Sequence, residues 1–156
     1  MAEFIVTDKL KRWIGHTEPA VVYKVEEGAI QRYARAIGDT NPLYNDVEYA
    51  SRSEYGRLMA PPGFAGWPVK NDFDFEGLIY NLIADGAPME NVDGGMEYEF
   101  LAPIGAGDLL TVVVRLISIT GRETSLGPTM VTTYEATYTN QNGALALIAR
   151  GTFLNY

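Results

Sequence analysis

Cysteine is missing from this sequence of 156 residues, and histidine occurs once. The chain therefore forms no disulfide, has no thiol nucleophile and offers no thiolate ligand to a metal ion. Basic residues are also scarce, with 12 Lys and Arg against 20 Asp and Glu and a formal net charge of -8. This charge argues against nucleic acid and against an anionic membrane surface as partners, because both select clusters of basic residues.

Long apolar runs are absent as well. No segment approaches the roughly 18 residues that a membrane-spanning helix requires, and the first five residues lack the basic-then-apolar pattern of a secretion signal. The sequence is nevertheless 47% hydrophobic and 12% aromatic, which is enough to bury one core in a chain of this length. We therefore expect a single domain over residues 1–156, in the cytoplasm, with no membrane partner.

Hydrophobic periodicity predicts helices near the N-terminus and strands near the C-terminus. Helical spacing is found at 8–14, at 26–37 before Gly38, at 47–50 after the capping residue Asp46, and around 78–83. Strands are expected at 21–25, 96–100, 110–116, 133–138 and 144–154, with Asn142-Gly143 as a hairpin turn. These elements predict an α+β domain with an antiparallel sheet of five or six strands and a helical segment that the sheet covers.

Two loops contain the residue types that could perform chemistry. Gly38 ends the helix over 26–37, and Asn41-Pro42 then requires an extended or turn backbone. A carboxylate, an amide and a phenol, those of Asp39, Asn41 and Tyr44, therefore lie on one short loop. The second loop, residues 60–64 (APPGF), is rigid up to its second proline, and Gly63 leaves its backbone open to close approach by a ligand.

The order of these motifs resembles the MaoC-like dehydratases, particularly the branch similar to the dehydratase domain of type I fatty acid synthases. The resemblance is carried by GDTNPLYND (38–46) and GRLMAPPGF (56–64), and then by FLAPIGAGDL (100–109) and YTNQNG (138–143). The resemblance implies the hot-dog fold, a sheet wrapped around a central helix. Because hot-dog units work as pairs and this chain has one, we expect a homodimer or a hetero-oligomer with a catalytic MaoC-like subunit.

One departure from the family pattern concerns the active site. In active members an Asp is followed five positions later by a His, and this pair handles the water and the proton in the hydration of an enoyl thioester. Here Asp39 is present, but Tyr44 stands at the fifth position. An ordinary tyrosine, with a pKa of about 10, is less ready to act as a base than an ordinary histidine by about 5 kcal/mol. The resemblance thus places Asp39 and Tyr44 at the catalytic positions of a site without its usual base.

The resemblance also makes Gly63 the start of the central helix, where its amide polarises the thioester carbonyl. Asn41 and Phe64 are then the neighbouring candidates for substrate binding. A side chain at Gly63 is expected to obstruct the ligand at little cost to the fold, because the two preceding prolines already fix the loop. The alternative is that Gly63 only permits tight packing. Residues 67–93 fit the family least well, and Pro68 predicts that the central helix is broken or partly replaced there.

Several candidate site residues could instead have a purely structural role. Asp39 is either a site residue or a turn residue that bonds its own backbone. His16, in a loop, is either a displaced base or an ordinary solvated residue. The following aromatic residues either line an acyl tunnel or fill the core: Phe64, Trp67, Phe73, Phe75 and Tyr80.

Three functions remain open at this point. The first is a MaoC-like hydratase or dehydratase subunit with an incomplete site, acting on acyl-CoA or acyl-carrier-protein thioesters beside a catalytic partner. The second is a self-sufficient hydratase or dehydratase that uses Asp39 and Tyr44. The third is a thioesterase or a non-enzymatic binder of acyl thioesters. Neither a metal nor another cofactor is expected in any of these.

Overall fold

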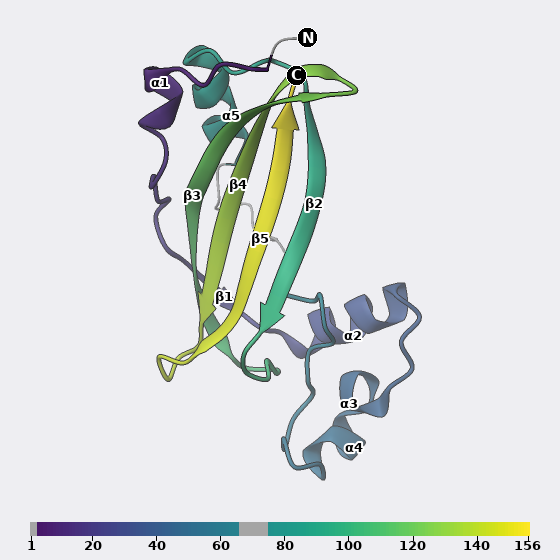
Figure 1. Ribbon diagram of the computed structural model, residues 1–156. Coiled ribbons are helices and arrows are strands. Elements are labelled where there is room, and N and C mark those ends of the chain that lie inside the picture. Colours follow the sequence, from purple (N-terminus) through teal and green to yellow (C-terminus); the bar gives the residue numbers. More distant parts are fainter. Residues whose placement is uncertain (1–2, 66–74) are drawn as a thin grey trace.

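The computed structural model describes residues 3–65 and 75–156. Its helices are α1 (Asp8–Lys11), α2 (Glu27–Ala36), α3 (Pro42–Asn45), α4 (Val47–Ser51) and α5 (Phe75–Ala84). Its strands are β1 (Val21–Lys24), β2 (Asn91–Phe100), β3 (Leu109–Thr124), β4 (Gly127–Thr139) and β5 (Leu145–Asn155). The strands form one sheet in the order β1-β3-β4-β5-β2, and every neighbouring pair is antiparallel. The predicted antiparallel sheet is confirmed, with five strands (Figure 1).

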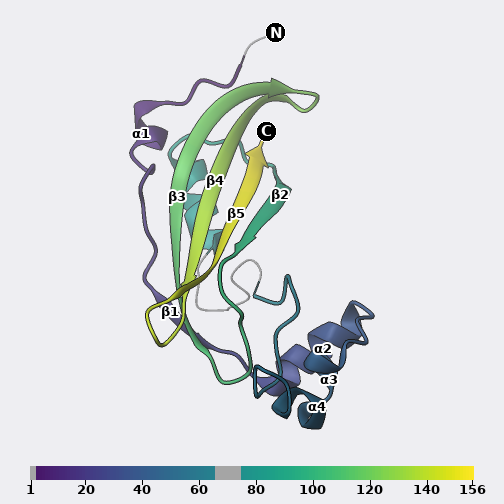
Figure 2. The same cartoon turned by 60° about the horizontal axis from the view of Figure 1, so that its bottom comes forward.

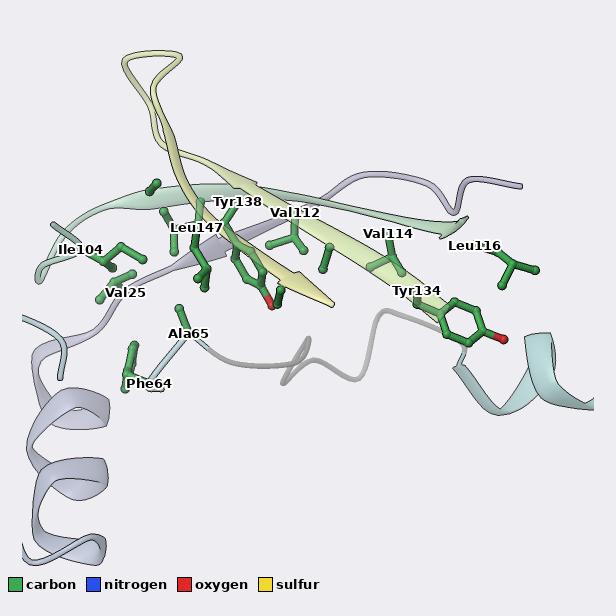
Figure 3. Packing of buried hydrophobic residues seen from close by; sticks show 14 of the residues in the cluster. Val25, Phe64, Ala65, Ile104, Val112, Val114, Leu116, Tyr134, Tyr138 and Leu147 are labelled. Carbon is green, nitrogen blue, oxygen red and sulfur yellow. The ribbon is translucent and has the colours of Figure 1, made fainter. Parts of the chain in front are cut away.

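The inner face of the sheet carries the core. Over 110–116 of β3 and 130–138 of β4 every second side chain is buried, as the alternation predicted, and Figure 3 shows side chains of these strands pointing to one side of the sheet. Leu78 and Leu82 of α5 are buried in the same cluster. Each fully buried aliphatic side chain contributes about 1.5–3 kcal/mol to folding relative to an exposed one. The long central strands and α5 therefore contribute much of the buried apolar surface of the domain.

Helices α2, α3 and α4 form a separate group beyond one end of the sheet, which we call the helical module (Figures 1 and 2). Ile30 and Ala34 of α2 face the core and are fully buried. The rest of the module is mostly exposed, including Ile37 and Tyr49, which are more than half exposed. The module is thus attached to the sheet by one side of α2 and by the loops that follow it.

Three elements differ from the sequence prediction. Helix α3 was not expected, because Asn41-Pro42 was interpreted as a turn; Asn41 is instead the N-cap, and Pro42 occupies the first turn, where its missing N–H costs nothing. Strand β2 begins at Asn91 and passes through Gly94-Gly95 with a shift of register, since pairing with β5 holds these glycines in the sheet. Strand β3 continues to Thr124, and at Gly121 an added Cβ would collide with the backbone of Phe4.

Candidate functional site

The loop that follows α2 is closed by its own hydrogen bonds. Gly38 has a φ of 72°, and the N–H of Asp39 donates to the carbonyl of Ala34 at 2.9 Å, which ends the helix. The Asp39 Oδ1 accepts the backbone N–H of Asn41 at 2.9 Å. The Asn41 Oδ1 in turn accepts the N–H of Leu43 at 3.0 Å and caps α3. Asp39 therefore acts as a turn residue that bonds its own backbone through at least one carboxylate oxygen.

Asn45 is the side chain that holds this loop together. Its Nδ2 donates to the carbonyl of Asp39 at 2.9 Å and to that of Asn41 at 3.0 Å. The side chain of Gln31 in α2 donates to the carbonyl of Asn45 at 3.0 Å. Neither residue was singled out from the sequence, although an amide four residues after a capping Asn is the signal that could have identified Asn45.

The second loop is joined to the first and to the sheet. The N–H of Met59 donates to the carbonyl of Leu43 at 2.9 Å, which places the two loops side by side. The N–H of Ala60 donates to the carbonyl of Ile104, and that of Ala106 to the carbonyl of Leu58, each at 2.8 Å. The segment before the two prolines is therefore fixed against residues 104–106 by paired backbone bonds.

An ion pair between a partly buried guanidinium and a buried carboxylate supports this arrangement. The Arg57 guanidinium donates to both carboxylate oxygens of Asp108, at 2.8 and 2.9 Å, and Asp108 is only 2% exposed. The N–H of Gly105 and the side chain of Gln141 also donate to this carboxylate. Burial by itself raises the pKa of Asp108, but the hydrogen bonds from Arg57, Gly105 and Gln141 outweigh it and hold the pKa below its ordinary value. We call Arg57 and Asp108 the clamp.

The two loops and the end of β2 enclose an apolar pocket of about 350 Å³. Tyr44 lines this pocket from the first loop, and Phe100 and Leu101 line it from the end of β2. The rest of the lining comes from residues 59–62 and 102–104, with Leu43, Tyr55 and Ala65. Asp39 lines a different hollow, with Arg35, Gly38, Thr40 and Asn45. Asp39 precedes α3 and Tyr44 lies within it, so the two residues are close in sequence but line two separate hollows.

Gly63 does not begin a helix. Residues 62–65 form a turn in which Gly63 has a φ of +88°, and the next helix among the described residues, α5, begins at Phe75. Pro68, where a break in the central helix was predicted, lies outside the described residues. A Cβ at Gly63 would lie 2.7 Å from the hydroxyl oxygen of Tyr33. The expectation that a side chain here costs the fold little is therefore wrong, because a positive φ and a close neighbour both oppose it.

Phe64 lies in the core. It is 7% exposed, and its ring packs edge-on against Tyr33 at 5.7 Å and lies 6.4 Å from the ring of Tyr23. Tyr80 is 68% exposed. Trp67 and Phe73 lie outside the described residues, as does the side chain of Phe75. Phe64, one of the five aromatic residues that could line an acyl tunnel or fill the core, therefore belongs to the core.

The other candidates have ordinary surroundings. His16 contacts Glu18 at 2.8 Å and packs edge-on against Trp13, and it lines neither hollow. Asp46 caps α4 through the N–H of Tyr49 at 3.0 Å, as predicted. Within residues 3–65 and 75–156, no three side chains of the kinds that ligate metals are grouped together. None of the helices in these ranges is long and apolar enough to cross a membrane.

Comparison with known proteins gives a family and a fold. The model of a family described as "FAS1-like, dehydratase domain region" matches residues 12–148. A UPF0336 protein of Parafrankia sp. (strain EAN1pec) is 34% identical over 142 residues, which are 85% of this chain and 87% of that protein. With other curated UPF0336 relatives the match is shorter, and it spans 64–67% of this chain and 65–66% of their length.

Two solved structures are similar to this chain in fold. A structure titled MaoC-like dehydratase has a TM-score of 0.75 at 25% identity and covers 94% of this chain and 43% of its own. A chain in the crystal structure of the ChsH1-ChsH2 complex from Mycobacterium tuberculosis has a TM-score of 0.78 at 19% identity, covering 96% of this chain and 94% of its own. The predicted hot-dog fold is confirmed by these likenesses.

Proposed function

Because the chain belongs to the FAS1-like dehydratase-region family of MaoC-like hot-dog proteins, we propose that it is a subunit of a hydratase or dehydratase. This subunit shapes an acyl-thioester site but lacks the complete catalytic pair of Asp and His. Its substrate is an acyl-CoA or acyl-carrier-protein thioester, and a second MaoC-like subunit supplies the Asp and His. The reaction is the hydration of a trans-2-enoyl thioester or its reverse, the dehydration of a 3-hydroxyacyl thioester.

The observation that carries this proposal is the position of Tyr44. It stands five residues after Asp39, where active members have His, and it lines an apolar pocket large enough for a short acyl chain. A phenol in such a pocket donates a hydrogen bond to a carbonyl or hydroxyl oxygen but does not take a proton from water near neutral pH. Tyr44 therefore suits the binding and orientation of an acyl group and not the role of general base.

The surroundings of Asp39 agree with this interpretation. Its Oδ1 is bonded to the N–H of Asn41, and Asn45 fixes the backbone on both sides of Thr40. Asp39 and Tyr44 line separate hollows, whereas a proton relay requires both groups near one reacting atom. The titles of neighbouring structures, such as the ChsH1-ChsH2 complex, describe assemblies of two different chains for those proteins, which supports a partner for this one.

Replacing Tyr44 tests the proposal. We expect wild type to hydrate a short trans-2-enoyl-CoA at close to the uncatalysed rate, and Tyr44→His to raise the rate by about 100-fold, which is the scale of one general base. Asp39→Asn is expected to leave the wild-type rate unchanged and to abolish the gain in Tyr44→His. Tyr44→Phe is the matched control, because it keeps the ring without supplying a base. A wild type that turns over rapidly, and that Tyr44→His slows, would contradict the proposal.

A further inference from the structure

One wall of the proposed acyl pocket is a short pairing of two loop segments. Residues 58–60 pair antiparallel with residues 104–106, and two backbone hydrogen bonds between them are each 2.8 Å long. We call this pairing the wall bridge. Three of its residues, Met59, Ala60 and Ile104, line the pocket. A displacement of the wall bridge therefore changes the shape of the pocket.

The clamp holds the wall bridge at the end opposite to the prolines of the second loop. Arg57 directly precedes the first segment of the bridge, and Asp108 follows the second segment by two residues. The Nη1 of Arg57 also donates to the carbonyl of Ala106 at 3.1 Å. At Gly105 an added Cβ would lie 2.7 Å from the Nε of Arg57, so the absence of a side chain there permits this close approach. The clamp thus fixes the two segments against each other.

Gln141, in the turn between β4 and β5, is bonded to the clamp. Its Nε2 donates to the Oδ1 of Asp108 at 3.0 Å, and its Oε1 accepts the N–H of Leu109, the first residue of β3, at 3.0 Å. None of the described residues that line the pocket belongs to this turn. Gln141 therefore joins the turn to the clamp without reaching the pocket.

The position of the Asp108 carboxylate is defined by donors from three segments of the chain. The Oδ1 accepts from Arg57 and Gln141, and the Oδ2 accepts from Arg57 and the N–H of Gly105. Hydrogen bonds to an ionised carboxylate are stronger than those between neutral groups. Without Gln141, the carboxylate keeps its ion pair but loses its link to the sheet, so Asp108 and Arg57 are free to shift together. Such a shift would pass directly to the wall bridge, because Arg57 is covalently joined to it.

We propose that Gln141, acting through Asp108 and Arg57, is a positioning residue for the acyl pocket. It holds the wall bridge in the form that accepts an acyl chain and does not touch the chain itself. The affinity for the acyl part of a thioester then depends on Gln141, whereas the affinity for the carrier does not. This inference rests on the proposed function for the identity of the ligand, and it adds a residue outside the pocket that determines the shape of the pocket.

The first test reads the position of the wall bridge without a ligand, from the methyl NMR resonances of Met59 and Ile104. Gln141→Met removes both side-chain hydrogen bonds at similar size and is expected to shift these resonances. Gln141→Lys again supplies a donor to Asp108 and should return them close to their wild-type positions. Asn142→Met is the matched control, because it changes an exposed neighbour in the same turn and leaves every hydrogen bond of the clamp in place.

Two results of this test would overturn the proposal. Unshifted resonances in Gln141→Met would show that the wall bridge does not depend on this side chain. Equal shifts in Gln141→Met and Gln141→Lys would show that the hydrogen bond to Asp108 is not the cause.

The second test measures binding of hexanoyl-CoA, a saturated thioester that cannot be hydrated, by calorimetric titration well below the unfolding temperature. We expect Gln141→Met to bind it about fivefold more weakly than wild type, because a smaller fraction of the protein has the pocket in its binding form. Gln141→Lys should bind nearly as well as wild type. All variants should bind free CoA equally, a result that general loss of structure would not give.

The two tests separate this inference from the proposed function. Equal affinity of Gln141→Met and wild type for hexanoyl-CoA, despite shifted methyl resonances, would overturn the positioning role. A wild type that binds no hexanoyl-CoA, while the methyl groups still respond to Gln141, would count against the proposed function alone, because the wall bridge would still be positioned as described.

Discussion

The sheet and the helical module of this protein are stabilised in different ways. The sheet is held by long antiparallel pairings, and its buried residues come from strands far apart in the sequence. The module is held mainly by caps and turns in which partners are two to six residues apart, as with Asp39, Asn41 and Asn45. The candidate site residues Asp39, Asn41 and Tyr44 belong to the module, since the first two lie between α2 and α3 and Tyr44 lies in α3. The candidate site is therefore built by local hydrogen bonds, and we expect replacements there to leave the sheet intact.

The clamp is where the two regions meet. Arg57 follows the module, and Asp108 precedes β3. We expect Asp108→Ala to have the largest effect of the changes considered, lowering the free energy of unfolding by about 3 kcal/mol, because it leaves a partly buried guanidinium without its carboxylate and the N–H of Gly105 without its acceptor. Urea unfolding measures this. Glu48→Ala, which breaks an exposed ion pair with Arg52 inside the module, is the control and should cost less than about 0.5 kcal/mol.

The pH dependence of the clamp distinguishes charge from packing. The pKa of Asp108 is lowered in the folded protein, so its stabilisation is present above the ordinary carboxyl pKa of about 3.9 and is lost as the pH falls through the folded value. The difference in unfolding free energy between wild type and Asp108→Asn should be constant above about pH 5 and shrink below about pH 4. A difference that does not change with pH would show that the carboxylate charge is unimportant.

Gly63 tests how firmly the second loop is held against α2. Gly63→Ala is expected to cost about 1–3 kcal/mol, because a residue with a side chain must adopt a positive φ there. Part of this cost should come from the hydroxyl of Tyr33, which a Cβ would approach to 2.7 Å. The double replacement Gly63→Ala/Tyr33→Phe should recover that part, as a double-mutant cycle of thermal unfolding can measure. A Gly63→Ala protein as stable as wild type would show that the loop rearranges freely.

The smallest effect is expected within the module itself. Asp46→Ala removes the cap of α4, which is worth about 1 kcal/mol locally, but α4 contributes only Ala50 to the core. Hydrogen exchange should therefore accelerate in residues 47–51, while the midpoint of global unfolding changes little. Asp46→Asn keeps an acceptor and is the control. Global destabilisation equal to the local loss would mean that the module and the sheet unfold as one unit.

The sequence predicted the buried faces of the strands better than it predicted where the strands begin and end. Alternation over 110–116 and 133–138 gave the buried faces of β3 and β4 correctly, because one face of each is covered by the core. The N-terminal part of β2 was missed, since Gly94-Gly95 is typical of a break and only pairing with β5 keeps it in the strand. Such pairing is a tertiary effect, and local sequence does not contain it.

For the candidate site, the sequence located the loops but not their contacts. Glycine, proline and capping residues placed Gly38 and the cap at Asp46 correctly. The separation of Asp39 and Tyr44 into two hollows depends on α3, a single turn of helix that the sequence analysis did not recognise. The clamp was also missed, because Arg57 and Asp108 are 51 residues apart and meet only after the sheet has formed.

The distribution of basic residues also determines how the edge of β2 can be studied by proteolysis and cross-linking. Trypsin cleaves after Lys and Arg, so residues 71–115 stay together in one peptide that contains the whole strand. Amine-reactive linkers find no lysine on β2, whereas a carbodiimide joins a carboxylate directly to an amine. A protein that lies against β2 would therefore be recorded as the peptide 71–115 joined through one of its carboxylates to a lysine of that protein.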